Sequence, residues 1–212
     1  MIYFYILIFC FNTVIGQNKY PSDSLLLSPN ISFVKKIGLV PISAWQRISY
    51  NSDFFNCQFY PSCSNYGSDA IKQFGLLRGG VIISERITRC NPFAFHYHLK
   101  QNNGFNDIDG RLIDSVIYLK SNNYEKSPFI AGLLSSIIPG LGRIYAGRTL
   151  DGVIGFWTFL LYSKTAHNSV KYKQKIATPV LTTISLYVYL GEIYGGWRTA
   201  KKFKSKKDDN NS

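Results

Sequence analysis

A long apolar segment near the C-terminus constrains the fold more than any other feature. Residues 176–197 form a run of 22 residues between Lys175 and Arg198, and the run contains one charged side chain, Glu192. As a helix it would extend over about 33 Å, which is enough to cross a bilayer. The sequence predicts a transmembrane helix with Glu192 near the interface; a buried helix of a soluble protein is the alternative.

Two shorter apolar segments precede this run. Residues 127–142 and 152–163 carry no charged side chain, but they have only 16 and 12 residues. Both fall short of the ~20 residues of a typical span, so they cross by snorkelling of flanking basic residues or form a re-entrant hairpin. Residues 128–197 are therefore predicted to form a membrane module with one to three transmembrane helices, followed by a basic polar tail at 198–212.

The N-terminus has the shape of a targeting segment. Residues 1–16 contain no charge and combine a ten-residue apolar run with small residues at the spacing of a cleavage site. This pattern predicts a signal peptide. An uncleaved anchor and a buried helix are the alternatives.

Composition narrows the class of protein. The chain has 24 Lys and Arg against 12 Asp and Glu, but charged residues make up only 17% of it. That fraction is below the usual quarter of a soluble domain, and the apolar content excludes a disordered basic chain. Six of the basic residues lie in 198–207, beside the predicted span. We interpret them as a topology signal and expect no nucleic acid partner.

Residues 31–50 read as a basic amphipathic helix. Apolar side chains occupy one half of its helical wheel, while Lys35, Lys36 and Arg47 lie on the other half. Pro41 should kink or split the helix. The helix either lies on an anionic membrane surface, with Trp45 at the interface, or packs its apolar face on a core.

A helix pair follows. Residues 64–74 have helical spacing, with Ser64 as the expected cap and Gly75 as the residue that ends the first helix. The second helix should run over 77–89 and end before a proline. Two glycines at its start, Gly79 and Gly80, indicate close approach of another backbone.

Three cysteines bracket this helix pair. Cys57 and Cys63 flank the aromatic loop CQFYPSC, and the pair of helices would fold Cys90 back beside it. One disulfide among the three and buried free thiols both remain open, and a zinc site completed by His96 or His98 is the weaker alternative. The sequence gives no thiol a base partner, so we expect no catalytic cysteine, no metal and no cofactor.

These motifs carry a family resemblance. The run from Trp45 to Ser49, the run CQFYPSCSNY over 57–66 and the run RCNPF over 89–93 resemble the membrane protein insertion efficiency factors of the YidD family. The resemblance covers about 37–95. It implies a small helical protein held at the bacterial inner membrane by an amphipathic helix, assisting the Sec–YidC insertion route, with no established catalytic activity. Its implied partners are the lipid bilayer, the insertase or translocon and client membrane proteins.

The resemblance also supplies candidate site residues. We expect a structural or partner-contact role for the motif residues, and a membrane-surface role for four residues of the amphipathic helix. The motif residues are Cys57, Phe59, Pro61, Cys63, Ser64, Tyr66, Arg86, Arg89, Cys90 and Pro92. The membrane-surface residues are Lys35, Lys36, Trp45 and Arg47. After Pro92 the chain departs from the usual ending of the family.

Together these features predict an all-α protein: a signal peptide at 1–16, a YidD-like helical domain with its Cys-flanked loop at 17–127, and a transmembrane helical module. The run PGLGRIYAGR in that module resembles C-terminal membrane modules of Bacteroidota envelope proteins. The predicted function is a non-enzymatic accessory factor for membrane protein insertion. A membrane-active or haemolysin-like protein and a Cys-based redox or metal protein are the alternatives.

The side of the membrane is predicted in two conflicting ways. If all three apolar segments cross, placing 17–127 in the periplasm leaves eight basic residues of the C-terminal half inside and four outside. The positive-inside rule favours that placement. The family resemblance implies the cytoplasmic face of the inner membrane instead.

Overall fold

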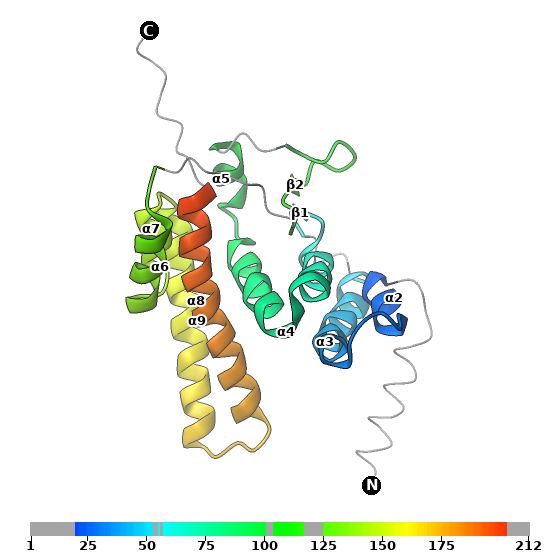
Figure 1. The fold of residues 1–212 in the computed structure, drawn as a ribbon. Helices are drawn as coiled ribbons and strands as arrows, with labels where there is room; N and C mark the ends of the chain where they lie inside the picture. The colour runs from blue at the N-terminus through cyan, green and yellow to red at the C-terminus, as the bar shows by residue number, and fades with distance from the viewer. Residues whose placement is uncertain (1–19, 53–54, 56, 101–103, 117–124, 203–212) are drawn as a thin grey trace.

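The protein is mostly helical. The computed structural model describes residues 20–52, 55, 57–100, 104–116 and 125–202 (Figure 1). The predicted signal peptide at 1–16, residues 117–124 and the tail after residue 202 lie outside these residues. The elements are α2 (Pro21–Leu27), α3 (Phe33–Ser49), β1 (Phe59–Tyr60), α4 (Cys63–Arg89), α5 (Ala94–Lys100), β2 (Leu112–Ile113), α6 (Pro128–Ile137), α7 (Leu141–Tyr145), α8 (Thr149–Lys171) and α9 (Ala177–Lys202).

The amphipathic segment forms the helix that its periodicity predicts. Helix α3 runs through Pro41 as one helix, so of the two predicted outcomes, a kink or a split, the split is wrong. Its buried residues, Leu39 among them, pack with α2 and with the first half of α4. These three elements make up the N-terminal part of the molecule (Figure 1).

Helix α4 is the helix pair that the sequence predicts. Gly75 is non-helical, with φ 81° and ψ 178°, so two helical arms fold against one another. A Cβ on Gly79 would lie 2.9 Å from the carbonyl oxygen of Ala70, which confirms the predicted close approach of a backbone. Because the chain folds back at Gly75, Cys63, the first residue of α4, lies near Cys90, the C-cap of α4.

The cap of α4 differs from the prediction. Ser62, not Ser64, is the N-cap, and its hydroxyl accepts a hydrogen bond from the backbone N–H of Asn65. Ser62 has the extended backbone that a cap requires, while Cys63 is already helical. Ser64 is instead buried in the first turn, where its carbonyl accepts a hydrogen bond from Ser68.

A two-stranded parallel sheet adds to the helices. Strands β1 and β2 pair Phe59 with Leu112 and Tyr60 with Ile113. Phe59 and Leu112 are buried together with Ala94 of α5. The sequence analysis missed these strands, because a pair of two-residue strands has no periodicity to detect. The pairing carries residues 104–116 back over the Cys-flanked loop.

Helix α9 organises the C-terminal half. It packs against α6, α7 and α8, and its other side contacts α4. A Cβ on Gly191 of α9 would lie 3.2 Å from the backbone nitrogen of Glu85, so α9 and α4 meet closely. The C-terminal helices are therefore joined to the motif-bearing part through a shared interface (Figure 1).

The prediction of membrane-crossing helices is wrong for the residues that the structure describes. None of their helices combines the length and the apolar character that a crossing requires. Helix α6 has 10 residues, and the longer α8 and α9 interrupt their apolar residues with polar and charged ones. Helix α9 also continues five residues beyond Trp197, so the predicted polar tail begins too early.

Candidate functional site

The Cys-flanked loop gathers three thiols. The Sγ atoms of Cys57, Cys63 and Cys90 all lie within 4.8 Å of one another, and the first two are 3.3 Å apart without being bonded. The contact with Cys63 lowers the pKa of Cys57, while the same contact raises the pKa of Cys63. Each side chain is half-buried. The predicted return of Cys90 to the loop is confirmed, and the loop holds free thiols.

The histidines that could have completed a metal site lie apart from the thiols. His98 is buried, and its Nε2 is 2.8 Å from the carbonyl oxygen of Gly104. His96 packs against the ring of Tyr97. Among the residues described, the one group of possible metal ligands consists of the three cysteines alone.

Arg86 of α4 holds the loop in position through contacts with its residues. Its guanidinium lies 4.0 Å from the ring centroid of Phe59 and 4.5 Å from that of Tyr66. It also donates hydrogen bonds to the carbonyl oxygens of Pro61 and Asp114. A guanidinium between two aromatic rings is a favourable cation–π arrangement, more so when it is buried. Four predicted motif residues therefore act together in positioning the loop.

The other predicted motif residues have simpler positions. Cys90 caps the C-terminal end of α4, and Pro92 lies exposed in the turn before α5. Arg89 is buried and pairs with Glu85, one helical turn earlier. The structure therefore brings together most of the motif but leaves Pro92 outside it.

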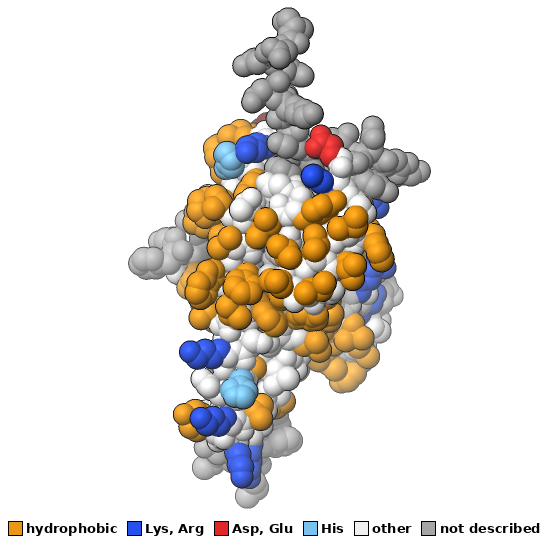
Figure 2. All heavy atoms as spheres, turned by 90° about the vertical axis from the view of Figure 1, so that its left-hand side faces the viewer, with side chains coloured by type: hydrophobic (Ala, Val, Ile, Leu, Met, Phe, Trp, Pro, Cys, Tyr) orange, Lys and Arg blue, Asp and Glu red, His pale blue; other side chains and the backbone are white. Residues whose placement is uncertain are grey.

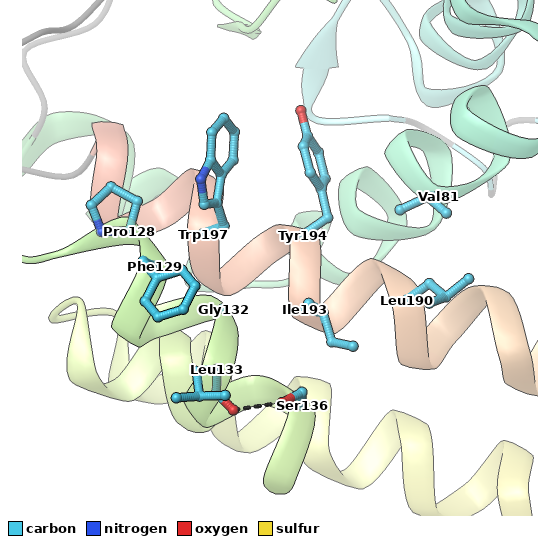
Figure 3. A pocket seen from close by; sticks show the side chains of 10 residues that line it. All are labelled: Val81, Pro128, Phe129, Gly132, Leu133, Ser136, Leu190, Ile193, Tyr194 and Trp197. Atoms are coloured by element: carbon cyan, nitrogen blue, oxygen red, sulfur yellow. Dashed lines mark hydrogen bonds between the residues drawn. The ribbon is translucent and has the colours of Figure 1, made fainter.

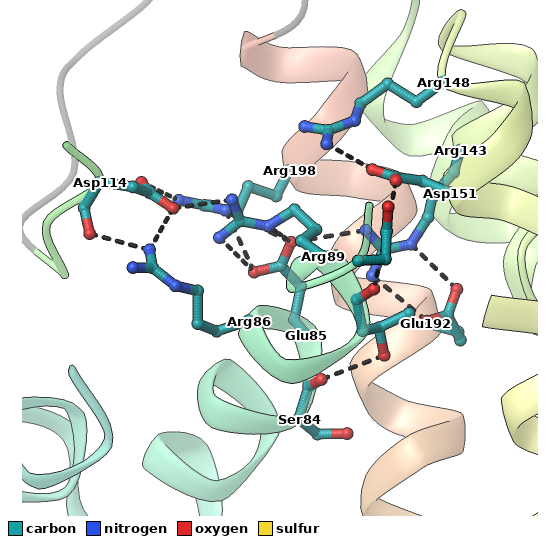
Figure 4. A network of polar contacts seen from close by, with 12 residues as sticks. Ser84, Glu85, Arg86, Arg89, Asp114, Arg143, Arg148, Asp151, Glu192 and Arg198 are labelled. Carbon is teal, nitrogen blue, oxygen red and sulfur yellow. Dashed lines mark hydrogen bonds and ion pairs between the residues drawn. The ribbon is translucent and has the colours of Figure 1, made fainter. Parts of the chain in front are cut away.

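Glu85 is the centre of a buried charge network (Figure 4). Its side chain is fully buried, and its carboxylate contacts guanidinium groups from three elements: Arg89 of α4, Arg143 of α7 and Arg198 of α9. Burial raises the pKa of Glu85, but the three arginines outweigh it and hold the pKa below its ordinary value. The network thus links the motif-bearing helix to the C-terminal half.

Asp114 forms a second acidic centre of the network. It pairs with Arg86 and Arg89 of α4 and with Arg198 of α9, the last at 2.9 Å. Burial raises its pKa, and the arginines reverse that shift and hold the pKa well below its ordinary value. Because Asp114 follows β2, the small sheet places this carboxylate between the two halves.

Two further ion pairs extend the network. Glu192 of α9 is fully buried, and its carboxylate accepts a hydrogen bond of 3.0 Å from Arg143. Burial raises the pKa of Glu192 despite this partner. Arg148 pairs with Asp151, which also accepts a hydrogen bond from Asn91. The prediction that Glu192 lies at a membrane interface is wrong, because it is enclosed by protein.

Helix α3 turns polar residues toward the protein and large apolar residues toward solvent. A helix that packs its apolar side on a core has the opposite orientation. Its buried face consists of Gly38, Leu39, Ser43 and Gln46. Its exposed face carries large apolar side chains. These are Phe33 at 77% exposed, Val34 at 57%, Ile37 at 51%, Trp45 at 45% and Ile48 at 57%. The apolar face is therefore turned outward, which contradicts the alternative that it packs on a core; we call it the α3 face.

Polar contacts explain why the other side of α3 turns inward. Ser43 and Arg47 both bind the carboxylate of Asp23 in α2. The amide of Gln46 donates to Asn65 of α4 and accepts from the backbone N–H of Ser22. These hydrogen bonds satisfy the buried polar groups, which would otherwise be costly to remove from water.

The predicted basic membrane-surface residues are partly used within the protein. Arg47 pairs with Asp23 at 2.8 Å, and Lys35 donates a hydrogen bond to the carbonyl oxygen of Lys72. Lys36 is half-exposed. Trp45 is exposed and packs edge-on against Phe55. Trp45 is thus the predicted surface residue that lies on the α3 face.

A second apolar surface lies on the C-terminal half. Figure 2 shows a continuous apolar band over α6 and α8, with basic side chains toward the tip of the α8–α9 hairpin. The exposed large apolar side chains of α6 and α8 include Phe129, Leu133, Ile137, Trp157 and Leu161, and we call these residues the α6–α8 face. Large exposed apolar surfaces mark sites of contact with membranes or proteins.

A groove lies between α4, α6 and α9 (Figure 3). Its volume is about 520 Å³, and it is open to solvent on one side. Its walls are almost entirely apolar. The lining residues are Val81, Pro128, Phe129, Gly132, Leu133, Ser136, Leu190, Ile193, Tyr194 and Trp197.

Comparison with known proteins matches the part of the chain that carries the motifs. The YidD family model, described as "Putative membrane protein insertion efficiency factor", matches residues 34–98. A relative of that name from Thermoanaerobacter pseudethanolicus is 42% identical over 60 residues, covering 28% of this chain and 87% of the relative. The chain belongs to the YidD family. No solved structure matches it.

Further YidD relatives carry the same name. One from Colwellia psychrerythraea is 39% identical over 66 residues, which is 31% of this chain and 80% of the relative. One from Oceanobacillus iheyensis is 53% identical over 38 residues, which is 18% of this chain and 42% of the relative. The YidD match begins at the second residue of α3, contains the Cys-flanked loop and α4, and ends at residue 98. Asp114 and helices α6 to α9 therefore lie outside it.

Sequence reasoning missed the acidic half of the charge network. Glu85 and Asp114 carry no motif signal, because neither acid belongs to a repeated or regularly spaced pattern. Arg143, Arg148 and Arg198 were counted as topology charges, but they are buried in ion pairs. The charge count that placed 17–127 in the periplasm therefore loses its basis. Buried ion pairs between distant segments leave no pattern in one sequence.

Proposed function

We propose that this YidD protein is a non-enzymatic factor that raises the efficiency of membrane protein insertion at the Sec–YidC insertase. The exposed α3 face carries this proposal. Five large apolar side chains, one of them a tryptophan, point away from the protein on helix α3, and four of the five lie within the YidD match. An apolar helical face with an interfacial tryptophan binds the headgroup–acyl boundary of a bilayer.

The α3 face binds the membrane chiefly through apolar burial. Arg47 and Lys35 have partners inside the protein, so the charge available for lipid headgroups is small. Full burial of one large apolar side chain contributes about 1.5–3 kcal/mol. We expect binding that depends on the apolar residues and responds weakly to salt.

The α6–α8 face provides a second contact with the membrane or with a client segment. Its exposed residues form a continuous surface, and the basic tip beside it suits anionic headgroups (Figure 2). This arrangement supports a peripheral position on the membrane, and we propose that the protein lies there beside an insertase. The cytoplasmic side of the inner membrane, where insertion clients emerge, is the location that fits this role.

A cell-based insertion assay tests the function. In a bacterium that lacks its own YidD protein, the fraction of a model inner-membrane protein that becomes inserted is measured by protease protection. Expression of the wild-type chain should raise that fraction. The variant Phe33→Gln, Ile37→Gln, Ile48→Gln should not, whereas Ile108→Gln, at a residue 93% exposed outside both faces, should act like the wild type.

Three results would contradict the proposal or the surface on which it rests. If the wild-type chain leaves insertion unchanged, the chain does not serve insertion. If it instead releases a dye enclosed in liposomes of bacterial lipid, the membrane-active alternative is correct. If the α3-face variant supports insertion as well as the wild type does, the α3 face is not needed for the function.

A further inference from the structure

We propose that Cys57, Cys63 and Cys90 form a binding site for one thiophilic metal ion, with Zn²⁺ as the expected occupant. The three Sγ atoms come from the loop before β1, the first residue of α4 and the C-terminal cap of α4, and they lie within 4.8 Å of one another. The fold brings together residues that are up to 33 positions apart.

The spacing of the sulfur atoms fits a tetrahedral ion. With a Zn–S bond of about 2.3 Å, two thiolate ligands of one Zn²⁺ lie about 3.8 Å apart. Cys57 and Cys63 are 3.3 Å apart, and no pair in the group exceeds 4.8 Å. Shifts of less than about 1 Å would therefore bring all three sulfurs into coordination distance.

Two of the three sulfurs accept hydrogen bonds from neighbouring groups. The backbone N–H of Cys63 donates to the Sγ of Cys57 at 3.3 Å, and the side-chain amide of Gln58 donates to the Sγ of Cys90 at 3.9 Å. Cys63 is also the first residue of α4, where the helix dipole favours negative charge. Hydrogen bonds of this kind orient metal ligands and tune them.

The ligand set determines what the ion can do. Three protein ligands leave a fourth position for water, and the thiols are half-buried rather than enclosed, so solvent can reach that position. Gln58 is anchored by a second hydrogen bond, of 2.8 Å, to the carbonyl oxygen of Asn91. The ion would tie the loop to both ends of α4. Since a disulfide uses only two thiols, the convergence of all three favours a metal.

Metal analysis of the full chain tests this site. The chain is purified in detergent with a reductant, washed with chelator, and titrated with Co²⁺ as a spectroscopic substitute for Zn²⁺. We expect about one ion per chain, with the thiolate-to-cobalt charge-transfer band of a tetrahedral site. Zn²⁺ should displace the Co²⁺ and remove the band.

Cysteine variants locate the ion. Cys57→Ser, Cys63→Ser and Cys90→Ser should each lose the charge-transfer band, and Gln58→Ala should weaken Co²⁺ binding about tenfold. Cys10→Ser, which removes the remaining cysteine of the chain, should bind as the wild type does. Circular dichroism identifies any variant that fails to fold, and the wild-type titration decides the question without the variants.

Four outcomes would overturn the site. The folded wild-type chain could bind no Co²⁺, or it could bind Co²⁺ without a charge-transfer band. Alternatively, mass spectrometry could find Cys57 and Cys63 joined in a disulfide in chain extracted from cells with its thiols blocked. A band that persists in Cys90→Ser would likewise reject the three-cysteine ligand set.

Discussion

Helix α4 has two interfaces that are built differently. Toward α3 and α2 its buried and half-buried hydrogen bonds join neutral groups, such as Gln46 to Asn65 at 2.9 Å and Ser22 to Ser68 at 2.6 Å. Toward α9 it uses full charges, with Glu85 fully buried among arginines. Loss of a neutral partner leaves one polar group without a hydrogen bond, whereas loss of a buried charge leaves its counter-charges uncompensated.

The two regions nevertheless share one property. On α3 the polar residues turn inward and the apolar ones outward, and in the C-terminal half the charges lie inside while α6 and α8 expose apolar residues. In both, specific polar contacts determine which side of a helix faces the protein. The apolar surface that results fits a protein that acts in contact with a membrane.

The largest effect should come from the charged interface. Glu85→Gln keeps the shape of the side chain but leaves Arg89, Arg143 and Arg198 without a shared carboxylate. We expect the free energy of unfolding to fall by about 3–5 kcal/mol, as when one partner of a buried ion pair is removed. Urea denaturation followed by circular dichroism measures this change.

The matched control is Glu125→Gln, because Glu125 is exposed before α6. Its unfolding free energy should stay within about 0.5 kcal/mol of the wild type. Equal stability of the Glu85 and Glu125 variants would show that the network does not hold the two halves together.

A smaller effect is expected at the neutral interface. Gln46→Ala removes the amide that joins Ser22 and Asn65, and Gln46 is fully buried. The free energy of unfolding should decrease by about 1–3 kcal/mol, the cost of unsatisfied buried polar groups. Gln73→Ala, at an exposed position of α4, is the control. A loss at Gln46 larger than that at Glu85 would reverse the ranking of the two interfaces.

The charged interface should also respond to pH through Lys202. Burial lowers the pKa of Lys202 from 10.5 to about 7, with Arg198 adding to the effect. Between these values the unfolded chain keeps a proton that the folded chain loses, so stability should rise with pH. The slope from this one group is at most about 1.4 kcal/mol per pH unit.

Comparison with Lys202→Met isolates this contribution. The difference in unfolding free energy between the variant and the wild type should shrink as the pH rises from 7 to 10. Denaturation curves at several pH values measure it, and a constant difference would mean that Lys202 keeps its proton in the folded protein.

The smallest effect on stability should come from the α3 face. Phe33→Gln with Ile37→Gln replaces exposed apolar residues, so the free energy of unfolding should change by less than about 0.5 kcal/mol. The same pair should weaken binding of the full chain to lipid vesicles, measured by flotation. A loss of stability above 1 kcal/mol would indicate that the face is covered by protein.

Local patterns predicted much of the N-terminal part. Three local signals were the periodicity of residues 31–50, Gly75 within α4 and Pro92 after α4. Each depends on residues that are close together in the chain, so these helices begin and end near the predicted positions. The motif residues Phe59, Pro61 and Tyr66 also proved to act together, because Arg86 contacts all three.

The C-terminal half was predicted less well for a physical reason. An apolar run has the same appearance whether it faces lipid or protein, and Glu192 alone could not show that Arg143 would lie beside it. Likewise, the helical wheel of residues 31–50 separated an apolar face from a polar face, but it did not predict which of the two is buried.

The sequence by itself determined the local elements, the Cys-flanked loop and membership of the YidD family. These depend on residues close together in the chain, such as the cysteines around CQFYPSC. Only the tertiary structure decided that α3 exposes its apolar face, that Glu85 and Asp114 join the two halves, and that three thiols converge. Each of these depends on contacts between distant segments, where the energy of pairing buried polar groups outweighs the preference of any one helix for burying its apolar side.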